Sequence, residues 1–303
     1  MAADAGRTPR PLCSTEARTA SEDPIATAEP VRYWVAVEYR GVWGRNPIEH
    51  AKLPEPVRAR LIDLGRRTPR TRVVFIRREG PQANGVQLFI ARTTESRPGL
   101  WSARVATLDD VATFPFEDYF DAEAPPSEVA SPLALVCTHG QHDPCCGLRG
   151  YPVYEALARA HGHVWQCSHV GGDRFAANVV VLPSGVYYAR VEPGDADDIA
   201  ATLRENRISL PHYRGRSCYG RYEQVIEAVV RRQHGLTGVD DVQVLDVESP
   251  RPSYWLGHAR DGFGRVHTVE VVEGRSEELG FLTCAAKRQE PRRVYEVVRC
   301  ETE

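Results

Sequence analysis

The residues that could do chemistry gather in the middle of the chain. Four of the eight cysteines lie between positions 137 and 167, and histidines lie close to them in the sequence. The candidates for chemistry are Cys137, Cys145, Cys146, Cys167, His139, His142 and His169. Thiolate together with imidazole suits zinc or an iron–sulfur cluster, whereas calcium and magnesium prefer oxygen ligands. The stretch therefore predicts a soft metal centre or thiol redox chemistry.

Two polar loops carry these side chains, and each follows a predicted buried strand. The strands cover 133–137 and 163–167, and a helix over 152–160 separates them. Ligands in α/β proteins collect beyond the carboxyl ends of strands. We therefore expect the two loops to meet although they lie far apart in the sequence.

The same order of elements occurs twice along the chain. In the first unit we expect a strand over 31–39, a helix over 54–64, strands over 71–76 and 86–91, and a short helix from Thr107. In the second unit the 133–137 strand, the helix and the 163–167 strand are followed by a hairpin turning at 183–185 and a helix over 194–206. This order predicts two tandem thioredoxin-like sheets covered by helices.

The predicted fold class is thus α/β (α+β), with four regions. Residues 1–30 form an irregular lead-in, 31–130 a thioredoxin-like domain without cysteines, 131–210 a thioredoxin-like domain with the metal site, and 211–303 an α+β appendage. The appendage is expected to hold a helix over 222–233 and strands at 242–247, 254–259, 266–272 and 294–298. The acidic, proline-rich segment 121–132 reads as a linker.

Composition excludes several classes of function. The 303 residues carry a formal charge of -3, which gives no electrostatic reason to bind nucleic acid or an anionic membrane. Neither a membrane-spanning run nor the apolar core of a signal peptide is visible. We expect a cytoplasmic protein, and in that reducing compartment clustered cysteines indicate metal binding rather than disulfides.

Two motifs resemble the sucrase/ferredoxin-like family, whose second domain is a thioredoxin-like [2Fe–2S] ferredoxin. They are CTHGQHDPCCG at 137–147 and SHVGGDRFAANVVVLPSGVYYARV at 168–191, with CSTEAR at 13–18 and WGRNPIE at 43–49 as weaker support. The resemblance implies an electron-transfer protein, rather than a stand-alone enzyme, that exchanges electrons at a [2Fe–2S] cluster with a reductase or acceptor protein.

The resemblance also implies the ligands. Cluster-binding members supply two cysteines with eight residues between them, which correspond to Cys137 and Cys146, and two histidines of an H-V/I-G-G-H motif. The first of these corresponds to His169, but Asp173 stands where the second is found. Asp173 is the expected fourth ligand, and water, Cys145 or Cys167 are alternatives.

Other interpretations stay open for the same residues. His139 and His142 are expected to shape their loop, with ligation as an alternative. The adjacent Cys145 and Cys146 could serve a thiol–disulfide or peroxide-reducing enzyme, although no C-x-x-C motif is present. A third interpretation is an interaction module that binds zinc or no metal. No nucleotide-binding or hydrolase motif occurs.

Overall fold

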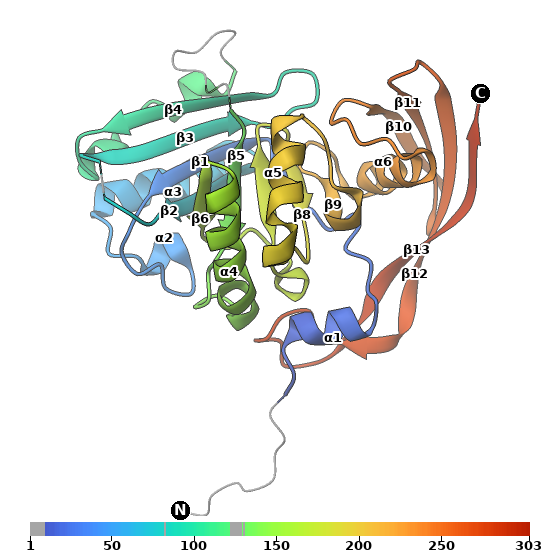
Figure 1. Cartoon of the computed structure of the whole chain (residues 1–303), viewed down its shortest axis with the longest axis horizontal. Helices are drawn as coiled ribbons and strands as arrows, with labels where there is room; N and C mark the ends of the chain where they lie inside the picture. The colour runs from blue at the N-terminus through green and yellow to red at the C-terminus, as the bar shows by residue number, and fades with distance from the viewer. Residues whose placement is uncertain (1–9, 82, 122–128, 130) are drawn as a thin grey trace, which may run out of the picture.

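A computed structural model describes residues 10–81, 83–121, 129 and 131–303. Its largest element is a nine-stranded mixed sheet in the order β4-β3-β1-β2-β6-β5-β7-β8-β9 (Figure 1). A separate antiparallel sheet has the order β10-β11-β12-β13. The expected α/β class is therefore present, with one continuous sheet joining both units of the repeat.

The first half of the large sheet contains the elements that the sequence predicts, and two more. It comprises β1 (Tyr33–Glu38), α2 (Pro47–His50), α3 (Glu55–Arg67), β2 (Thr71–Arg77), β3 (Val86–Arg92) and β4 (Gly99–Val105). The strand β4 was not expected, because polar and small residues interrupt its apolar pattern. The helix expected from Thr107 is only a 3₁₀ turn, η1 (Asp109–Ala112), and a second turn, η2 (Phe116–Tyr119), follows it.

The second half follows the same order, but one helix begins earlier than predicted. It comprises β5 (Leu133–Cys137), α4 (Pro144–Ala160), β6 (Val164–Cys167), η3 (Asp173–Phe175), β7 (Val179–Leu182), β8 (Val186–Tyr188), η4 (Pro193–Asp195) and α5 (Ala196–Arg204). The expected helix over 152–160 is thus only the last part of α4. Cys145 and Cys146 therefore lie in the first turn of a helix, not in a loop.

Capping and packing explain the early start of α4. The Asp143 side chain accepts a hydrogen bond from the Cys145 N–H, and Pro144 occupies the first helical position, which proline favours. Gly150 weakens the helical propensity of the sequence, but a Cβ there would lie 2.0 Å from the Cys137 carbonyl oxygen. Glycine is needed at this position because the helix lies directly against β5.

The two halves of the sheet share one topology. In each half a parallel pair (β1 with β2, β5 with β6) is extended by an antiparallel strand beside the first strand (β3, β7) and another beyond it (β4, β8). The corresponding strands β2 and β6 pair antiparallel, with Ile76 opposite Cys167. This pairing sets the end of β2 beside the loop that follows β6.

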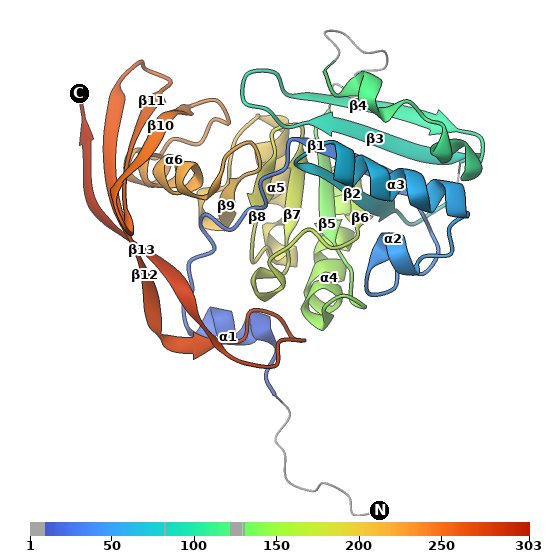
Figure 2. The ribbon, with the colours of Figure 1, turned by 180° about the vertical axis from the view of Figure 1, so that it is seen from behind.

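The C-terminal region supplies the last strand of the large sheet, one long helix and all four strands of the small sheet. It contains η5 (Leu210–His212), β9 (Tyr213–Arg216), α6 (Arg221–His234), β10 (Val242–Arg251), β11 (Tyr254–Asp261), β12 (Val266–Gly280) and β13 (Glu290–Thr302). The helix and four of these strands were expected, and the short β9, which completes the large sheet, was not. Figures 1 and 2 show the long β12–β13 hairpin reaching from the small sheet to helix α1.

Helix α1 (Cys13–Thr19) lies within the segment expected to be an irregular lead-in. It has no apolar periodicity of its own, so tertiary packing holds it: Arg149 of α4 donates to the hydroxyls of Ser14 and Thr15. Residues 1–9 and most of the expected linker 121–132 lie outside the described residues. No helix in the described part of the chain is long and apolar enough to cross a membrane.

Candidate metal centre

Three of the predicted ligands meet at the end of the second half of the sheet. Cys137 is the last residue of β5, Cys146 lies in the first turn of α4, and His169 follows β6. One donor atom from each lies within 4.8 Å of the other two. Both cysteines are 1% exposed, whereas 19% of the His169 side chain is exposed. The thiols thus face the interior and the imidazole lies toward solvent.

Asp173, the predicted fourth ligand, lies between the thiol and the imidazole. Its Oδ1 is 3.2 Å from the Cys146 Sγ, which donates to it, and 3.0 Å from the His169 Nδ1. The side chain is 3% exposed. The structure therefore brings all four predicted residues together, with the carboxylate where it can reach either neighbour.

His142, for which the sequence left ligation open as an alternative, is also close to this group. Its ring stacks on that of His169 with the centroids 3.7 Å apart, and its Nε2 lies 3.9 Å from Asp173 Oδ2. Donor atoms of His142, His169 and Asp173 form a second set within 4.8 Å of one another. His142 is thus a further candidate for the fourth coordination position.

The segment between β1 and α2 contacts the loop that carries His139 and His142. The Gly44 carbonyl lies against His139 Nε2, and the Arg45 carbonyl lies 3.1 Å from His142 Nδ1. The His169 N–H donates to His139 Nδ1, so the His139 proton is on Nε2, where it can be donated to Gly44. His139 therefore positions the backbone of His169, as expected for a residue that shapes the loop.

A buried arginine supports the loop that carries His169 and Asp173. Arg214 Nη1 donates to the Gly171 carbonyl at 3.0 Å and to Asn178 Oδ1 at 3.1 Å. Gly171 and Gly172 have φ of +87° and +78°, and a Cβ on Gly172 would lie 2.4 Å from Arg214. Glycine suits both positions because it adopts positive φ without a steric penalty.

The alternatives proposed for the fourth position lie elsewhere. Cys167 pairs with Cys137 in the β5–β6 ladder and packs in the same apolar cluster as Cys137 and Cys146. It belongs to none of the metal-binding groups among the described residues. Cys145 belongs to a different group, with Cys13, Cys284 and Asp143. The adjacent Cys145 and Cys146 therefore serve separate clusters of side chains.

The electrostatics of the metal-free centre favour ionised ligands. A hydrogen bond from the Cys146 thiol holds the pKa of Cys137 well below its usual value, against the effect of burial. Burial also opposes ionisation of Asp173, but His169 outweighs it and lowers the pKa of this carboxyl. A cation would therefore meet Cys137 and Asp173 with their pKa values lowered. However, it would have to displace protons from Cys146, whose pKa is raised by its hydrogen bond to Cys137 and by burial, and from His169.

The donor set fits a metal centre with two kinds of ligand. The Nδ1 of His169 is buried, and the charged group it faces is Asp173, whose Oδ1 lies 3.0 Å away. Two thiols lie on one side, and imidazole and carboxylate groups lie on the other. The residues present thus suit the soft metal centre that the sequence predicts.

Comparison with known proteins shows the family of this chain. A sequence model described as sucrase/ferredoxin-like matches residues 24–215. The chain belongs to the sucrase/ferredoxin-like family. A curated relative, altered inheritance of mitochondria protein 32 from Meyerozyma guilliermondii, is 32% identical over 100 residues, which cover 29% of this chain and 36% of the relative. The match thus spans only about a third of that relative's length.

One solved structure matches part of this chain. The thioredoxin-like [2Fe–2S] ferredoxin from Aquifex aeolicus has 20% sequence identity and a TM-score of 0.23, covering 25% of this chain and 83% of its own. The family match includes both loops of the centre and the Gly44 and Arg45 carbonyls that hold the histidines. For this member of the sucrase/ferredoxin-like family, the buried cysteine groups could hold a metal.

The metal-free protein should show an unusual histidine titration. Burial alone would lower the pKa of His169, but Asp173 and Cys137 raise it to about 9. The charged His169 stabilises the folded apo-protein fully below its ordinary pKa of 6.5, and this contribution is lost as the pH rises through about 9. NMR titration should report this pKa, and Asp173→Asn should lower it. A His169 that titrates unchanged in the variant would contradict the pairing.

Proposed function

We propose that this protein transfers single electrons at a [2Fe–2S] cluster held by Cys137, Cys146, His169 and Asp173. One observation carries the proposal: two thiols from different elements and an imidazole offer donor atoms within 4.8 Å of one another, with both thiols buried. Such a cluster, when bound, supplies a one-electron redox couple. Membership in the sucrase/ferredoxin-like family supports this choice of cofactor.

The proposed assignment gives each iron two protein ligands. Cys137 and Cys146 would hold one iron, and His169 with Asp173 the other. His142 is the alternative to Asp173, because its ring is stacked on His169. The Gly44 and Arg45 carbonyls, together with His139, would keep these imidazoles oriented before any metal binds. The first half of the sheet would thus serve as a support for the histidine side.

The repeated strand order supports two tandem thioredoxin-like units, with the cluster in the second. The histidine side of the centre would face the redox partner, because His142 and His169 are its most exposed members. Both line a surface hollow with Asn46, Ile48 and Arg72. We propose a reductase or acceptor protein as the occupant of this face, in the cytoplasm, with no role for nucleic acid or membrane.

Replacing Asp173 with histidine should raise the reduction potential of the cluster. A neutral imidazole in place of a carboxylate removes one negative charge, which favours the reduced state. Redox titration of the wild-type protein and Asp173→His measures the difference. His142→Gln is the matched comparison, since it should retain the cluster if Asp173 is the ligand. An unchanged potential in Asp173→His, or loss of the cluster in His142→Gln, would remove Asp173 from the ligand set.

A thiol–disulfide or peroxide-reducing enzyme is the second candidate, and one observation favours it. A hydrogen bond from Cys13 lowers the pKa of Cys145 to about 6, which would make this thiol a competent nucleophile. However, Cys145 is fully buried and does not share a group with Cys146. Turnover with peroxide or disulfide substrates that is lost in Cys145→Ser would support this candidate.

A zinc-bound interaction module is the third candidate. Two cysteines, a histidine and an aspartate would also suit one tetrahedral zinc ion. Metal and sulfide analysis separates this possibility from the [2Fe–2S] centre, because only the cluster contains inorganic sulfide.

A further inference from the structure

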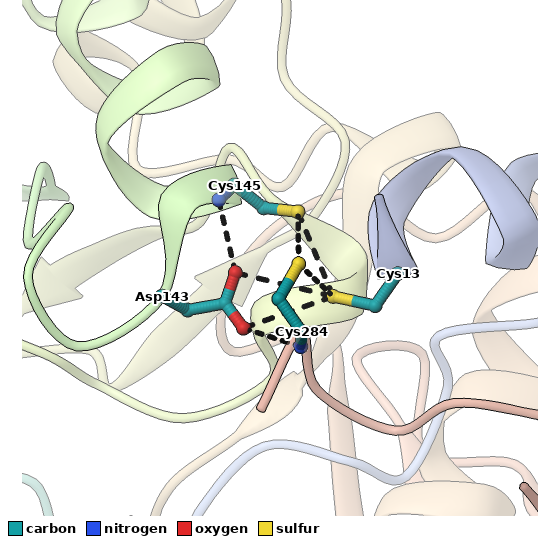
Figure 3. A group of neighbouring side chains, drawn as sticks. All are labelled: Cys13, Asp143, Cys145 and Cys284. Carbon is teal, nitrogen blue, oxygen red and sulfur yellow. Dashed lines mark hydrogen bonds between the residues drawn. The ribbon is translucent and has the colours of Figure 1, made fainter. Parts of the chain in front are cut away.

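A second group of cysteines lies on the other side of the first turn of α4. It brings together Cys13 from the start of α1, Cys145 from α4 and Cys284 from the turn between β12 and β13, with the carboxylate of Asp143 beside them (Figure 3). These elements come from the two ends of the described chain and from its middle. Four donor atoms, one from each residue, lie within 4.8 Å of one another.

The three sulfurs form a nearly equilateral triangle. The Sγ–Sγ distances are 3.6 Å from Cys13 to Cys145, 3.4 Å from Cys145 to Cys284 and 3.5 Å from Cys284 to Cys13. Thiolates on one tetrahedral zinc ion, with Zn–S bonds of about 2.3 Å, lie about 3.8 Å apart. A disulfide needs about 2.05 Å. The three Sγ–Sγ distances are therefore near those expected between thiolates that bind one zinc ion. None of the three cysteines forms a disulfide.

Asp143 is placed to complete this tetrahedron. Its oxygens lie 4.0 and 3.9 Å from the Cys13 Sγ. The Cys145 N–H donates to Oδ1 at 2.9 Å and the Cys284 N–H donates to Oδ2 at 2.7 Å, so the carboxylate is fixed in orientation. Figure 3 shows the carboxylate directed toward the same space as the three sulfurs.

The charge of Asp143 is another sign that a cation belongs here. The side chain is 1% exposed, and no arginine, lysine or histidine among the described residues forms an ion pair with it. A buried carboxylate is costly unless hydrogen bonds or an opposite charge compensate for it. The two backbone N–H groups and the long contacts from the Cys13 thiol supply part of this compensation, and a divalent ion would supply more.

The surrounding contacts hold the group together independently of any metal. Arg10 donates to the carbonyls of Thr283 and Ala286, on either side of Cys284. The Phe281 N–H donates to Glu16 of α1 at 3.2 Å. Arg149 ties α1 to α4, as described above. The three thiols are thus positioned by a built framework, as a preorganised metal site requires.

We propose that Cys13, Cys145, Cys284 and Asp143 bind one structural Zn²⁺ ion, separate from the cluster centre. Soft thiolates favour zinc, and a closed set of four protein ligands is typical of structural rather than catalytic zinc. The ion would join the N-terminal helix and the β12–β13 hairpin to α4. Because Cys145 and Cys146 are adjacent, the first turn of α4 would then bind the zinc ion on one side and the cluster on the other.

Metal analysis of paired variants tests this site without reference to electron transfer. The full-length protein is loaded with Zn²⁺, dialysed against a mild chelator, and analysed for zinc and iron. Cys137→Ser/Cys146→Ser should lose iron but retain about one zinc per chain. Cys13→Ser/Cys284→Ser should lose that zinc, and Cys300→Ser, outside both groups, should lose neither metal. Zinc retained in Cys13→Ser/Cys284→Ser, or absent from Cys137→Ser/Cys146→Ser, would overturn the proposal.

Cobalt substitution gives a second readout that does not require a stable zinc-site variant. Co²⁺ added to Cys137→Ser/Cys146→Ser should produce thiolate-to-cobalt charge-transfer bands and the visible bands of a tetrahedral ion. Asp143→Asn should weaken metal binding by about 10-fold or more in the same background. Absence of thiolate-to-cobalt bands in this variant would overturn the site. If the wild-type protein lacks iron, only the proposed function fails, because the zinc result is independent of it.

Discussion

Cys146→Ser should abolish binding of the [2Fe–2S] cluster. The Cys146 thiol is 1% exposed, and its donor atom lies within 4.8 Å of those of Cys137 and His169, so no solvent ligand could take its place. We expect iron and sulfide to fall to background levels after anaerobic reconstitution, with loss of the visible absorption of the cluster. Metal analysis and absorption spectra of the purified variant give the result.

Cys300→Ser is the matched control for this loss. Cys300 is a partly buried cysteine of β13 that lies outside the groups of described side chains that could hold a metal. It should therefore keep the iron content of the wild-type protein. If Cys146→Ser still binds a cluster with an unchanged spectrum, the assignment of Cys146 as a ligand is wrong.

Glu227→Gln should destabilise the protein by about 3–5 kcal/mol. Glu227 of α6 is fully buried with two arginines: Arg231 donates to its Oε1 from Nε and Nη2 at 3.1 and 3.0 Å, and Arg216 Nη1 lies 3.7 Å away. Tyr213 donates to the other carboxylate oxygen. The neutral amide would leave two buried guanidinium groups without a counter-ion, which is far costlier than the loss of a surface pair.

Asp23→Asn provides the comparison for Glu227→Gln. It makes the same change in an ion pair with Arg232 whose side chains are 54% and 45% exposed. Exposed pairs contribute about 0–1 kcal/mol, so its unfolding midpoint should shift little. Denaturant unfolding of the metal-free proteins measures both changes. A loss of under about 1 kcal/mol in Glu227→Gln would contradict a structural role for this buried network.

The sequence predicted the centre better than it predicted the elements around it. The two polar loops were identified because they follow buried strands, which are local features, and the resemblance to the sucrase/ferredoxin-like family implied Cys137, Cys146 and His169 as the ligands within this region. The start of α4 was missed, since Gly147 and Gly150 lower the helical propensity that local patterns report. Only the close approach of α4 to β5, which is a tertiary contact, explains why Gly150 is tolerated within the helix.

Contacts between distant segments could not be predicted. Cys13 and Cys284 are far from Cys145 in the sequence, yet they lie beside it because α1 and the β12–β13 turn meet at α4. The place of His142 depends similarly on the Arg45 carbonyl of the first half of the sheet. No periodicity or motif near these residues indicates such neighbours, since they are set by the packing of whole elements.

Anaerobic purification followed by metal, sulfide and electron paramagnetic resonance analysis tests the central proposal most directly. We expect a coloured protein with the two irons and two sulfides of a [2Fe–2S] centre, which becomes paramagnetic on one-electron reduction. A colourless protein that contains neither iron nor sulfide after reconstitution would contradict the proposal.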